Sequence, residues 1–319
     1  MPSKKRYTRA RKRRCDRVAQ QRQLPVRRSL TLCSEGKSLL MLVELAIGDA
    51  YGAGFEYAPN RLIRERNDLS GYVQHPRHGI RPGCYTDDTQ MSIAIAEAIV
   101  SGQPWTRDNL ADRFVTAFKR DPREGYAGRF YAFLQEIEDG DEFLAKIRPH
   151  SDKSGAAMRA TPIGTFPNVS TVIERCKLQA ALTHDTPDGI NAAIAASLMS
   201  HYFLYNVGPK SELPQFITEF VPGSWIAPWQ GKVGAKGLMS VHAALTAVMS
   251  RESLSEILKA CIAFTGDVDT VATVALGAAS CSNEIEQDLP PVLIDTLENG
   301  AYGLDYLRKL DAQLMRTVA

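Results

Sequence analysis

The chain has 319 residues, of which 44% are apolar and 23% are charged, which is ordinary for a globular protein of one large domain or two smaller ones. Its longest candidate for a membrane span, residues 39–43, is followed by Glu44 and Asp49 and is far shorter than the roughly 20 apolar residues that a span requires. The six cysteines form no CxxC pair and no Cys/His ligand spacing, so a structural zinc site and a disulfide scaffold are not expected.

The N-terminal segment differs in charge from the rest of the chain. Residues 1–28 hold 12 of the 38 Lys and Arg residues and one of the 36 Asp and Glu residues, a net charge of +11, whereas 26 basic and 35 acidic residues follow. Few aliphatic side chains and Pro25 predict a disordered basic arm over 1–35 and a catalytic domain over 36–319. No signal-peptide pattern accompanies the arm, which favours a cytoplasmic location without membrane contact.

Three interpretations of the arm stay open. It is a solvated tail, it contacts nucleic acid without sequence preference, or it binds an acidic protein partner and folds across that surface. Nucleic acid is the less favoured partner because the arm offers only Tyr7 for stacking on bases.

The rest of the chain reads as helices in sequence order. Their boundaries carry Gly, Pro, Asp or Thr, and no sustained alternation of apolar and polar residues indicates strands. Small residues are abundant in several of them, which allows close helix packing in one compact all-α domain. The expected helices are 39–50, 89–100, 107–119, 170–182, 187–205, 237–249, 254–263, 268–281 and 302–315.

Two acidic clusters each precede a helix rich in small apolar residues. The first, 86–89, reads Thr-Asp-Asp-Thr, and the second, 266–270, reads Gly-Asp-Val-Asp-Thr. Helix N-capping explains one such residue in each cluster. Two carboxylates so close repel each other unless a cation lies between them, and oxygen ligands suit magnesium or manganese. The pair of clusters therefore predicts a metal site.

Two further segments have a structural and a functional interpretation. Residues 48–56, GDAYGAGFE, read either as a helix end followed by a glycine-rich turn or as part of a site with acids on both sides. Residues 154–164, SGAAMRATPIG, read either as a tight helix-packing surface or as a loop whose arginine meets phosphate.

Five motifs in order then resemble the ADP-ribosylglycohydrolase family, which includes dinitrogenase reductase activating glycohydrolase. They are GDAYGAGFE, YTDDTQM, GAAMRATPIG, LTHDTPDG and FTGDVDTVA, within about residues 36–319. The resemblance implies a compact all-α fold, two Mg²⁺ or Mn²⁺ ions at an ADP-ribose cleft, and hydrolysis of an N- or O-glycosidic bond at the C1″ carbon of ADP-ribose.

The resemblance also assigns roles to individual residues. It implies catalytic roles for Glu56, Asp87 and Asp269, with Glu56 as a gating or proton-transfer group. The implied metal ligands are Thr86, Asp87, Asp88, Asp267, Asp269 and Thr270. The implied substrate-binding residues are Glu56, Gly125, Tyr126, Ser154, Gly155, Ala157, Met158, Arg159 and His184. For His184, a core histidine satisfied by the backbone stays as the alternative.

The resulting hypothesis is a metal-dependent hydrolase that removes ADP-ribose from modified protein, with arginine as the first candidate acceptor. It extends to an immunity protein of a toxin–antitoxin pair, which reverses the modification and blocks an ADP-ribosyltransferase toxin with its arm. The alternative is a stoichiometric inhibitor that binds the transferase through the arm. Serine and arginine acceptors differ in the leaving group rather than in the metal site, so the sequence does not decide between them.

Overall fold

The computed structural model describes residues 41–318, and every regular element in that part of the chain is a helix. The prediction of an all-α fold is confirmed, because residues 41–318 contain isolated β-bridges but no strand. None of the helices in this part of the chain is long and apolar enough to cross a membrane. The predicted arm and the first two residues of the first predicted helix lie outside the described residues.

All nine predicted helices are present, with ends that differ from the predicted ones by at most about three residues. They are α2 (Met41–Ala53), α4 (Asp87–Val100), α5 (Arg107–Arg120), α8 (Val169–Ala181), α9 (Pro187–Leu204), α11 (Gly237–Ser250), α12 (Leu254–Ala263), α13 (Val268–Ala279) and α15 (Leu304–Met315).

Five shorter helices were not predicted. They are α3 (Asn60–Arg66), α6 (Gly128–Glu136), α7 (Gly140–Lys146), α10 (Leu213–Phe220) and α14 (Pro291–Asp295), and short 3₁₀ turns include η1 (Ser154–Ala156) and η2 (Thr161–Thr165). Four of the five helices have no side-chain hydrogen bond at the N-cap, so the usual start signal is missing from their sequences. Packing against the rest of the fold, rather than a local capping signal, therefore stabilises these helices.

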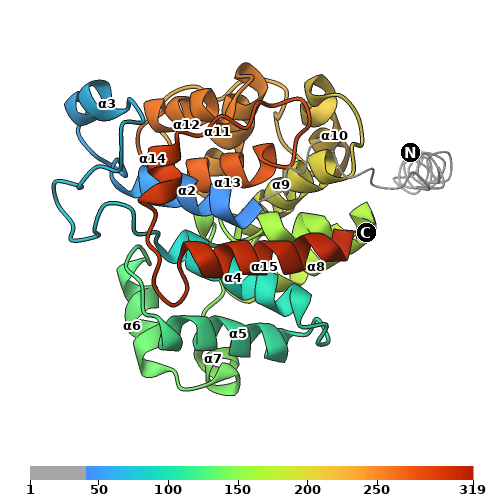
Figure 1. The fold of residues 1–319 in the computed structure, drawn as a ribbon. Coiled ribbons are helices and arrows are strands. Elements are labelled where there is room, and N and C mark those ends of the chain that lie inside the picture. The colour runs from blue at the N-terminus through green and yellow to red at the C-terminus, as the bar shows by residue number, and fades with distance from the viewer. Residues whose placement is uncertain (1–40, 319) are drawn as a thin grey trace, which may run out of the picture. The chain divides into compact units, whose positions relative to one another are not determined.

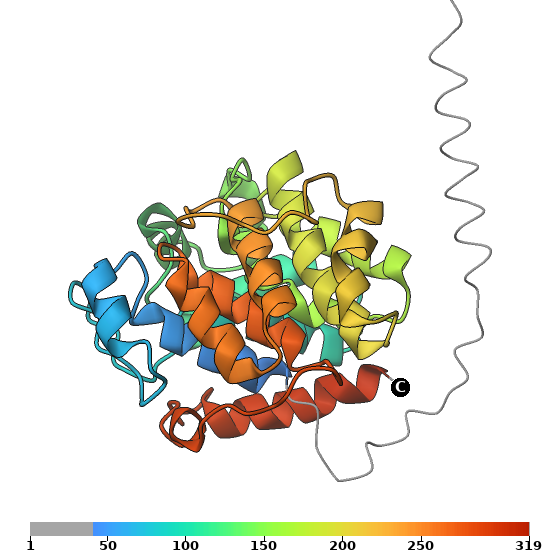
Figure 2. The same cartoon turned by 90° about the horizontal axis from the view of Figure 1, so that it is seen from above.

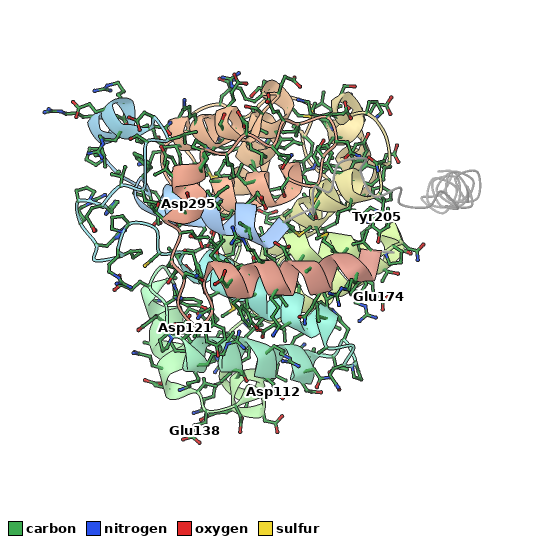
Figure 3. The ribbon with its side chains drawn as sticks, viewed as in Figure 1. Asp112, Asp121, Glu138, Glu174, Tyr205 and Asp295 are labelled. Carbon is green, nitrogen blue, oxygen red and sulfur yellow. The ribbon has the colours of Figure 1, made fainter. Side chains whose placement is uncertain are left out.

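Helices α2 and α13 lie side by side in the middle of the helical body (Figure 1). Helices α11 and α12 pack on α13, whereas α4 and α15 contact α2, and α15 runs along one edge of the body (Figure 2). Helix α5 packs against α4, and α7 packs on α5. In Figure 3 the labelled Asp112 lies on α5, and its carboxylate accepts a hydrogen bond of 2.8 Å from the backbone N–H of Gly140 at the start of α7.

Glycines allow the backbones of α2 and α13 to touch. A Cβ atom added to Gly48 would lie 2.6 Å from the carbonyl oxygen of Ala272, and one added to Gly52 would lie 2.3 Å from the Cα of Asp269. Because the two glycines are four residues apart, they lie on one face of α2. This close packing brings the start of α13 against the last turn of α2.

A buried aspartate of α15 secures the described start of α2. The Asp311 carboxylate accepts hydrogen bonds from the backbone N–H groups of Met41 (3.0 Å), Leu42 (2.8 Å) and Val43 (3.1 Å). A carboxylate from a distant part of the sequence therefore holds the first described turn of α2 in place. The position of α2 is thus set at both of its ends.

The contact between α2 and α13 makes a prediction about stability. Gly48→Ala is expected to lower the free energy of unfolding by about 2 kcal/mol, because the added methyl group overlaps the α13 backbone. The matched control is Gly128→Ala in α6, where an added Cβ meets no atom within 4 Å. Denaturant titration of both variants measures the effect. Equal stability of the two variants would contradict the proposed backbone contact.

Candidate metal centre

The first acidic cluster is held in place by an aspartate of α2. Asp49 is fully buried and accepts four hydrogen bonds, from the backbone N–H of Thr86 (2.9 Å) and Thr89 (2.9 Å) and from the hydroxyls of Thr86 (2.7 Å) and Thr89 (2.6 Å). Thr86 is the N-cap of α4, and its hydroxyl accepts from the backbone N–H of Asp88. Capping therefore does not occupy the carboxylates of Asp87 and Asp88.

The second cluster also departs from simple helix capping. Asp267 is the N-cap residue of α13, yet its carboxylate makes no capping hydrogen bond. It instead accepts a hydrogen bond of 3.1 Å from the hydroxyl of Ser240 in α11, and the nearby Ser154 side chain in η1 offsets part of the rise in the pKa of Asp267. Asp269, on the first turn of α13, accepts a hydrogen bond of 2.9 Å from the backbone N–H of Thr270. Both aspartates are buried.

The two clusters, about 180 residues apart in sequence, meet in the fold. Glu56, Asp267 and Asp269 each offer a carboxylate oxygen, and these three oxygens lie within 4.8 Å of one another. The first cluster meets the second where the Thr270 side chain lies close enough to the Asp88 carboxylate to offset part of the rise in its pKa. The end of α2 and the starts of α4 and α13 thus contribute carboxylates to a single acidic site.

Burial and mutual repulsion dominate the electrostatics of this site. Burial, with the nearby Asp267 and Asp49 charges, raises the pKa of Glu56 to about 7. For Asp87, Asp88 and Asp269, burial is the largest cause and neighbouring carboxylates the next, and the pKa values lie well above the ordinary range. The folded chain therefore resists ionisation of these groups unless positive charge is supplied.

The donor set fits a divalent cation. The Oδ2 atom of Asp88 is buried and has no hydrogen-bond partner, which is costly for a carboxylate oxygen without a ligand. None of the ion pairs found in residues 41–318 involves a carboxylate of the site. Carboxylate and hydroxyl oxygens suit magnesium or manganese. The identity and number of the ions, and Asp88 as a ligand, stay predictions.

The threonines of the predicted ligand set keep lone pairs for a cation. The Thr86 hydroxyl gives its proton to Asp49, so its oxygen can accept only. The Thr270 side chain, on the first turn of α13, lies close enough to Asp88 to offset part of the rise in the pKa of that carboxyl. Both side chains are buried beside the carboxylates.

Gly125 and Tyr126 lie against the first cluster. Gly125 has φ +108°, and an added Cβ would lie 2.2 Å from Oδ1 of Asp87, so only glycine fits there. The Tyr126 hydroxyl donates a hydrogen bond of 2.6 Å to Oε1 of Gln90 and is committed within the protein. Gly125 is exposed beside the carboxylates, whereas Tyr126 is buried behind them.

The predicted substrate loop, residues 154–159, borders the second cluster. Ser154 and Gly155 are partly exposed, whereas Ala157 and Met158 are buried. Arg159 is 2% exposed, and its guanidinium donates to the Gly155 carbonyl (2.7 Å), to Gln179 and to Thr183. These bonds within the protein favour a positioning role for Arg159 over direct contact with phosphate.

His184 lies behind the same loop. An added Cβ at Gly155 would be 2.9 Å from its Cε1 atom, and its Nδ1 is 2.7 Å from the Thr183 hydroxyl. Burial, followed by the Arg159 charge, lowers the pKa of His184 to about 3, against a smaller opposite effect of Asp152. The imidazole is therefore neutral at physiological pH and does not serve as a proton donor there.

Three residues of the site were missed at the level of sequence. Asp49 lies inside a motif that was singled out, and its position one turn before a glycine-rich segment was the available signal. Ser240 and His75 gave none. His75 donates from Nε2 to the Glu56 carbonyl (2.9 Å) and accepts from the Arg77 backbone N–H at Nδ1 (3.1 Å), which fixes its tautomer and the Glu56 backbone.

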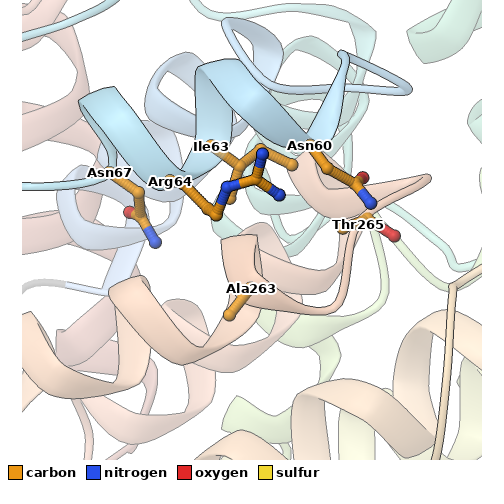
Figure 4. Close-up of a pocket in the computed structure, with 6 residues that line it drawn as sticks. All are labelled: Asn60, Ile63, Arg64, Asn67, Ala263 and Thr265. Carbon is orange, nitrogen blue, oxygen red and sulfur yellow. The ribbon is translucent and has the colours of Figure 1, made fainter.

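A surface groove of about 410 Å³ opens next to the site, between α3 and the end of α12. Figure 4 shows the residues that line it, which are Asn60, Ile63, Arg64, Asn67, Ala263 and Thr265. No carboxylate of the acidic site lines the groove. Thr265, which lines the groove, precedes Asp267 of the second cluster by two residues in the sequence.

Fold and site together define an all-α protein with a buried cluster of carboxylates suited to divalent cations. A profile of the ADP-ribosylglycohydrolase family matches residues 36–318. The chain therefore belongs to the ADP-ribosylglycohydrolase family, as its motifs predicted.

Individual relatives are more distant. The chain is 29% identical over 185 residues to the ADP-ribosylhydrolase ARH3 of Xenopus tropicalis, covering 55% of this chain and 53% of that protein. It is 22% identical over 253 residues to the ADP-ribosylarginine hydrolase Tri1 of Pseudomonas putida, covering 73% and 67%. The chain thus spans about half the length of the ARH3 proteins it matches. A solved ADP-ribosylglycohydrolase-related protein complex shares the fold, with a TM-score of 0.68 and 20% identity, over 88% of this chain and 98% of that one.

The site predicts metal-dependent stability that varies with pH. Because the pKa of Glu56 is raised from 4.5 to about 7, the folded metal-free chain retains a proton that the unfolded chain releases, and stability falls as pH rises through this window. A divalent cation at about 100 times its Kd adds about 2.7 kcal/mol, which corresponds to several degrees in Tm. The rise in Tm with Mg²⁺ or Mn²⁺ is expected to be larger at pH 8 than at pH 5. An equal rise at both pH values in thermal unfolding would contradict the account.

Proposed function

We propose that the protein hydrolyses the glycosidic bond between ADP-ribose and a modified protein side chain, with arginine as the acceptor. The observation that carries the proposal is the convergence of Glu56, Asp267 and Asp269 on one point beside the first acidic cluster. Membership of the ADP-ribosylglycohydrolase family and the similarity to ARH3 and Tri1 support it.

Thr86, Asp87, Asp88, Asp267, Asp269 and Thr270 would hold two magnesium or manganese ions. When bound, such ions supply Lewis-acid polarisation of oxygen and orient the groups that they bind. The chain itself contributes fixed positions, because Asp49 and the α2–α13 contact hold the carboxylates before substrate arrives.

Glu56 is the carboxylate best suited to move a proton. It is partly exposed, whereas the aspartates around it are buried, and burial with neighbouring charges raises its pKa to about 7. Glu56 accepts a proton from the attacking water, whose oxygen forms the new bond to C1″. The bond from C1″ to the guanidino nitrogen breaks, its electron pair stays on that nitrogen, and the leaving group takes up the proton that Glu56 received from water, which returns Glu56 to the carboxylate form.

The predicted binding residues supply the other wall of the site. Ser154, Gly155 and Gly125 are accessible beside the carboxylates, and their exposed backbone can approach a ribose or a phosphate closely. Ala157 and Met158 shape the loop from beneath. In this proposal Arg159 and His184 hold the loop through Gly155, and Tyr126 supports the first cluster.

The test is hydrolysis of ADP-ribosyl-arginine protein against ADP-ribosyl-serine protein, with Mg²⁺ or Mn²⁺ and with a chelator. Asp269→Asn is expected to fold and to lose about 100-fold or more of the activity, because it removes a buried ligand without changing its shape. Asp141→Asn, on the exposed surface of α7, is the matched control. Full turnover by Asp269→Asn, or metal-independent turnover by the native chain, would contradict the proposal.

The charge of the N-terminal segment favours a second function. Residues 1–28 carry a net charge of +11, which suits an acidic protein surface. We propose that this arm binds an ADP-ribosyltransferase toxin and blocks it, so that the protein protects the cell by two routes. In the alternative, this stoichiometric inhibition is the main function and hydrolysis contributes little.

A binding comparison tests the arm. The full chain is expected to bind the transferase more tightly than a chain lacking residues 1–35, and more so at low salt, because charge attraction is screened by ions. Pull-down at two salt concentrations measures this. Equal capture of both chains would exclude the arm as the binding element, and protection by Asp269→Asn would indicate direct blocking.

A further inference from the structure

Tyr57, next to Glu56, has a backbone conformation that is uncommon for an aromatic residue. Its φ is +48°, in the left-handed region that a bulky side chain rarely adopts. Its N–H donates to the Gly266 carbonyl (2.8 Å), and its own carbonyl accepts from Nη2 of Arg77 (2.6 Å). Thr265 and Gly266 beside it also have positive φ, at +64° and +97°. Two strained residues, Tyr57 and Thr265, thus lie next to a glycine with positive φ at one edge of the acidic site.

This conformation keeps the Tyr57 side chain near the carboxylates. Burial, followed by the charges of Asp267, Glu56 and Asp269, raises the pKa of the Tyr57 phenol to about 12. The side chain is nevertheless partly exposed. An accessible ring therefore lies within the field of the same three carboxylates that converge at the candidate metal centre.

The face of the Tyr57 ring already receives a cation. The ammonium of Lys232 lies 5.1 Å from the ring centroid, which is cation–π distance. The Lys232 stem crosses Gly266, where an added Cβ would be 3.2 Å from its Cγ. Lys232 is exposed and takes no part in the ion pairs found in residues 41–318. An exposed ammonium without an ion pair among those found thus covers a ring face suited to positive charge.

We propose that Tyr57 determines the acceptor, with its ring stacking against the guanidinium of an ADP-ribosylated arginine that displaces Lys232. This inference rests on the proposed hydrolysis and specifies the substrate class of the same site. A guanidinium is planar and weakly hydrated, so it stacks on an aromatic face better than an ammonium does. A serine acceptor has neither charge nor plane and gains nothing from the ring.

The groove beside the site gives the rest of the substrate a path. It begins at Thr265, next to the Gly266 that holds the Tyr57 backbone, and it is lined by α3, which starts three residues after Tyr57 (Figure 4). A polypeptide whose arginine lies on Tyr57 can continue along this groove.

The experiment compares kcat/KM on ADP-ribosyl-arginine and ADP-ribosyl-serine peptides for three variants. Tyr57→Leu is expected to lower the ratio of arginine to serine turnover about fivefold. Tyr57→Phe keeps the ring and is expected to keep the ratio of arginine to serine turnover. Tyr, Leu and Phe all have a Cβ atom, so the backbone strain at position 57 is the same in the native chain and in both Tyr57 variants. Lys232→Met is expected to lower KM for the arginine peptide, because it removes the competing cation.

The outcomes separate this inference from the proposed function. If the native chain hydrolyses arginine peptide but Tyr57→Leu loses both activities equally, the inference is overturned and the proposed function stands. If the native chain acts on serine alone, the inference and the arginine acceptor are both overturned, and only ADP-ribosyl hydrolysis stands. If the native chain cleaves neither substrate with metal present, both fail. A rise in KM for both peptides in Lys232→Met would overturn the displacement of Lys232.

Discussion

The backbone contact between α2 and α13 is the constraint on which the rest of the site depends. One face of α2 has Gly48 and Gly52, which admit the start of α13, and another has Asp49, which organises the start of α4. Glu56 follows directly after the helix and completes the acidic cluster. A single short motif therefore holds three helix ends in register. Its glycines allow the contact with α13, and its aspartate positions the start of α4.

The same arrangement imposes an electrostatic cost. Several carboxylates are buried within reach of one another, and burial and repulsion oppose their ionisation. A globular core gains nothing from such a cluster, so the cost indicates a functional site that needs a cation to balance it. Backbone strain at Tyr57 and Thr265 adds to this cost in the same place.

The sequence predicted the long helices because their patterns and boundaries are local properties. It did not predict α3 or α14, since these are short and follow prolines without side-chain caps. The acidic clusters were recognisable because adjacent aspartates exceed what capping needs. Ser240 and His75 could not be found in this way, since their roles arise only from distant contacts with Asp267 and with the Glu56 carbonyl.

Arg159 illustrates a different limit. Its position in a loop rich in small residues is typical of a phosphate site. Its guanidinium instead donates hydrogen bonds to Gln179, Thr183 and the Gly155 carbonyl. Residue type and spacing indicate that an arginine belongs to the site. Its contacts in the folded chain decide whether it faces the ligand or supports the loop. Tyr57 is the converse case, in which an unremarked residue gains a role from backbone geometry and from the cation above its ring.

The central claim is that the two acidic clusters form one cation site. Anomalous diffraction from crystals of the full chain grown with Mn²⁺ tests it most directly. The account predicts manganese peaks among the oxygens of Glu56, Asp267 and Asp269 and beside Oδ2 of Asp88. Saturating Mn²⁺ with no peak at these oxygens, and carboxylates that stay paired with one another through protons, would contradict it.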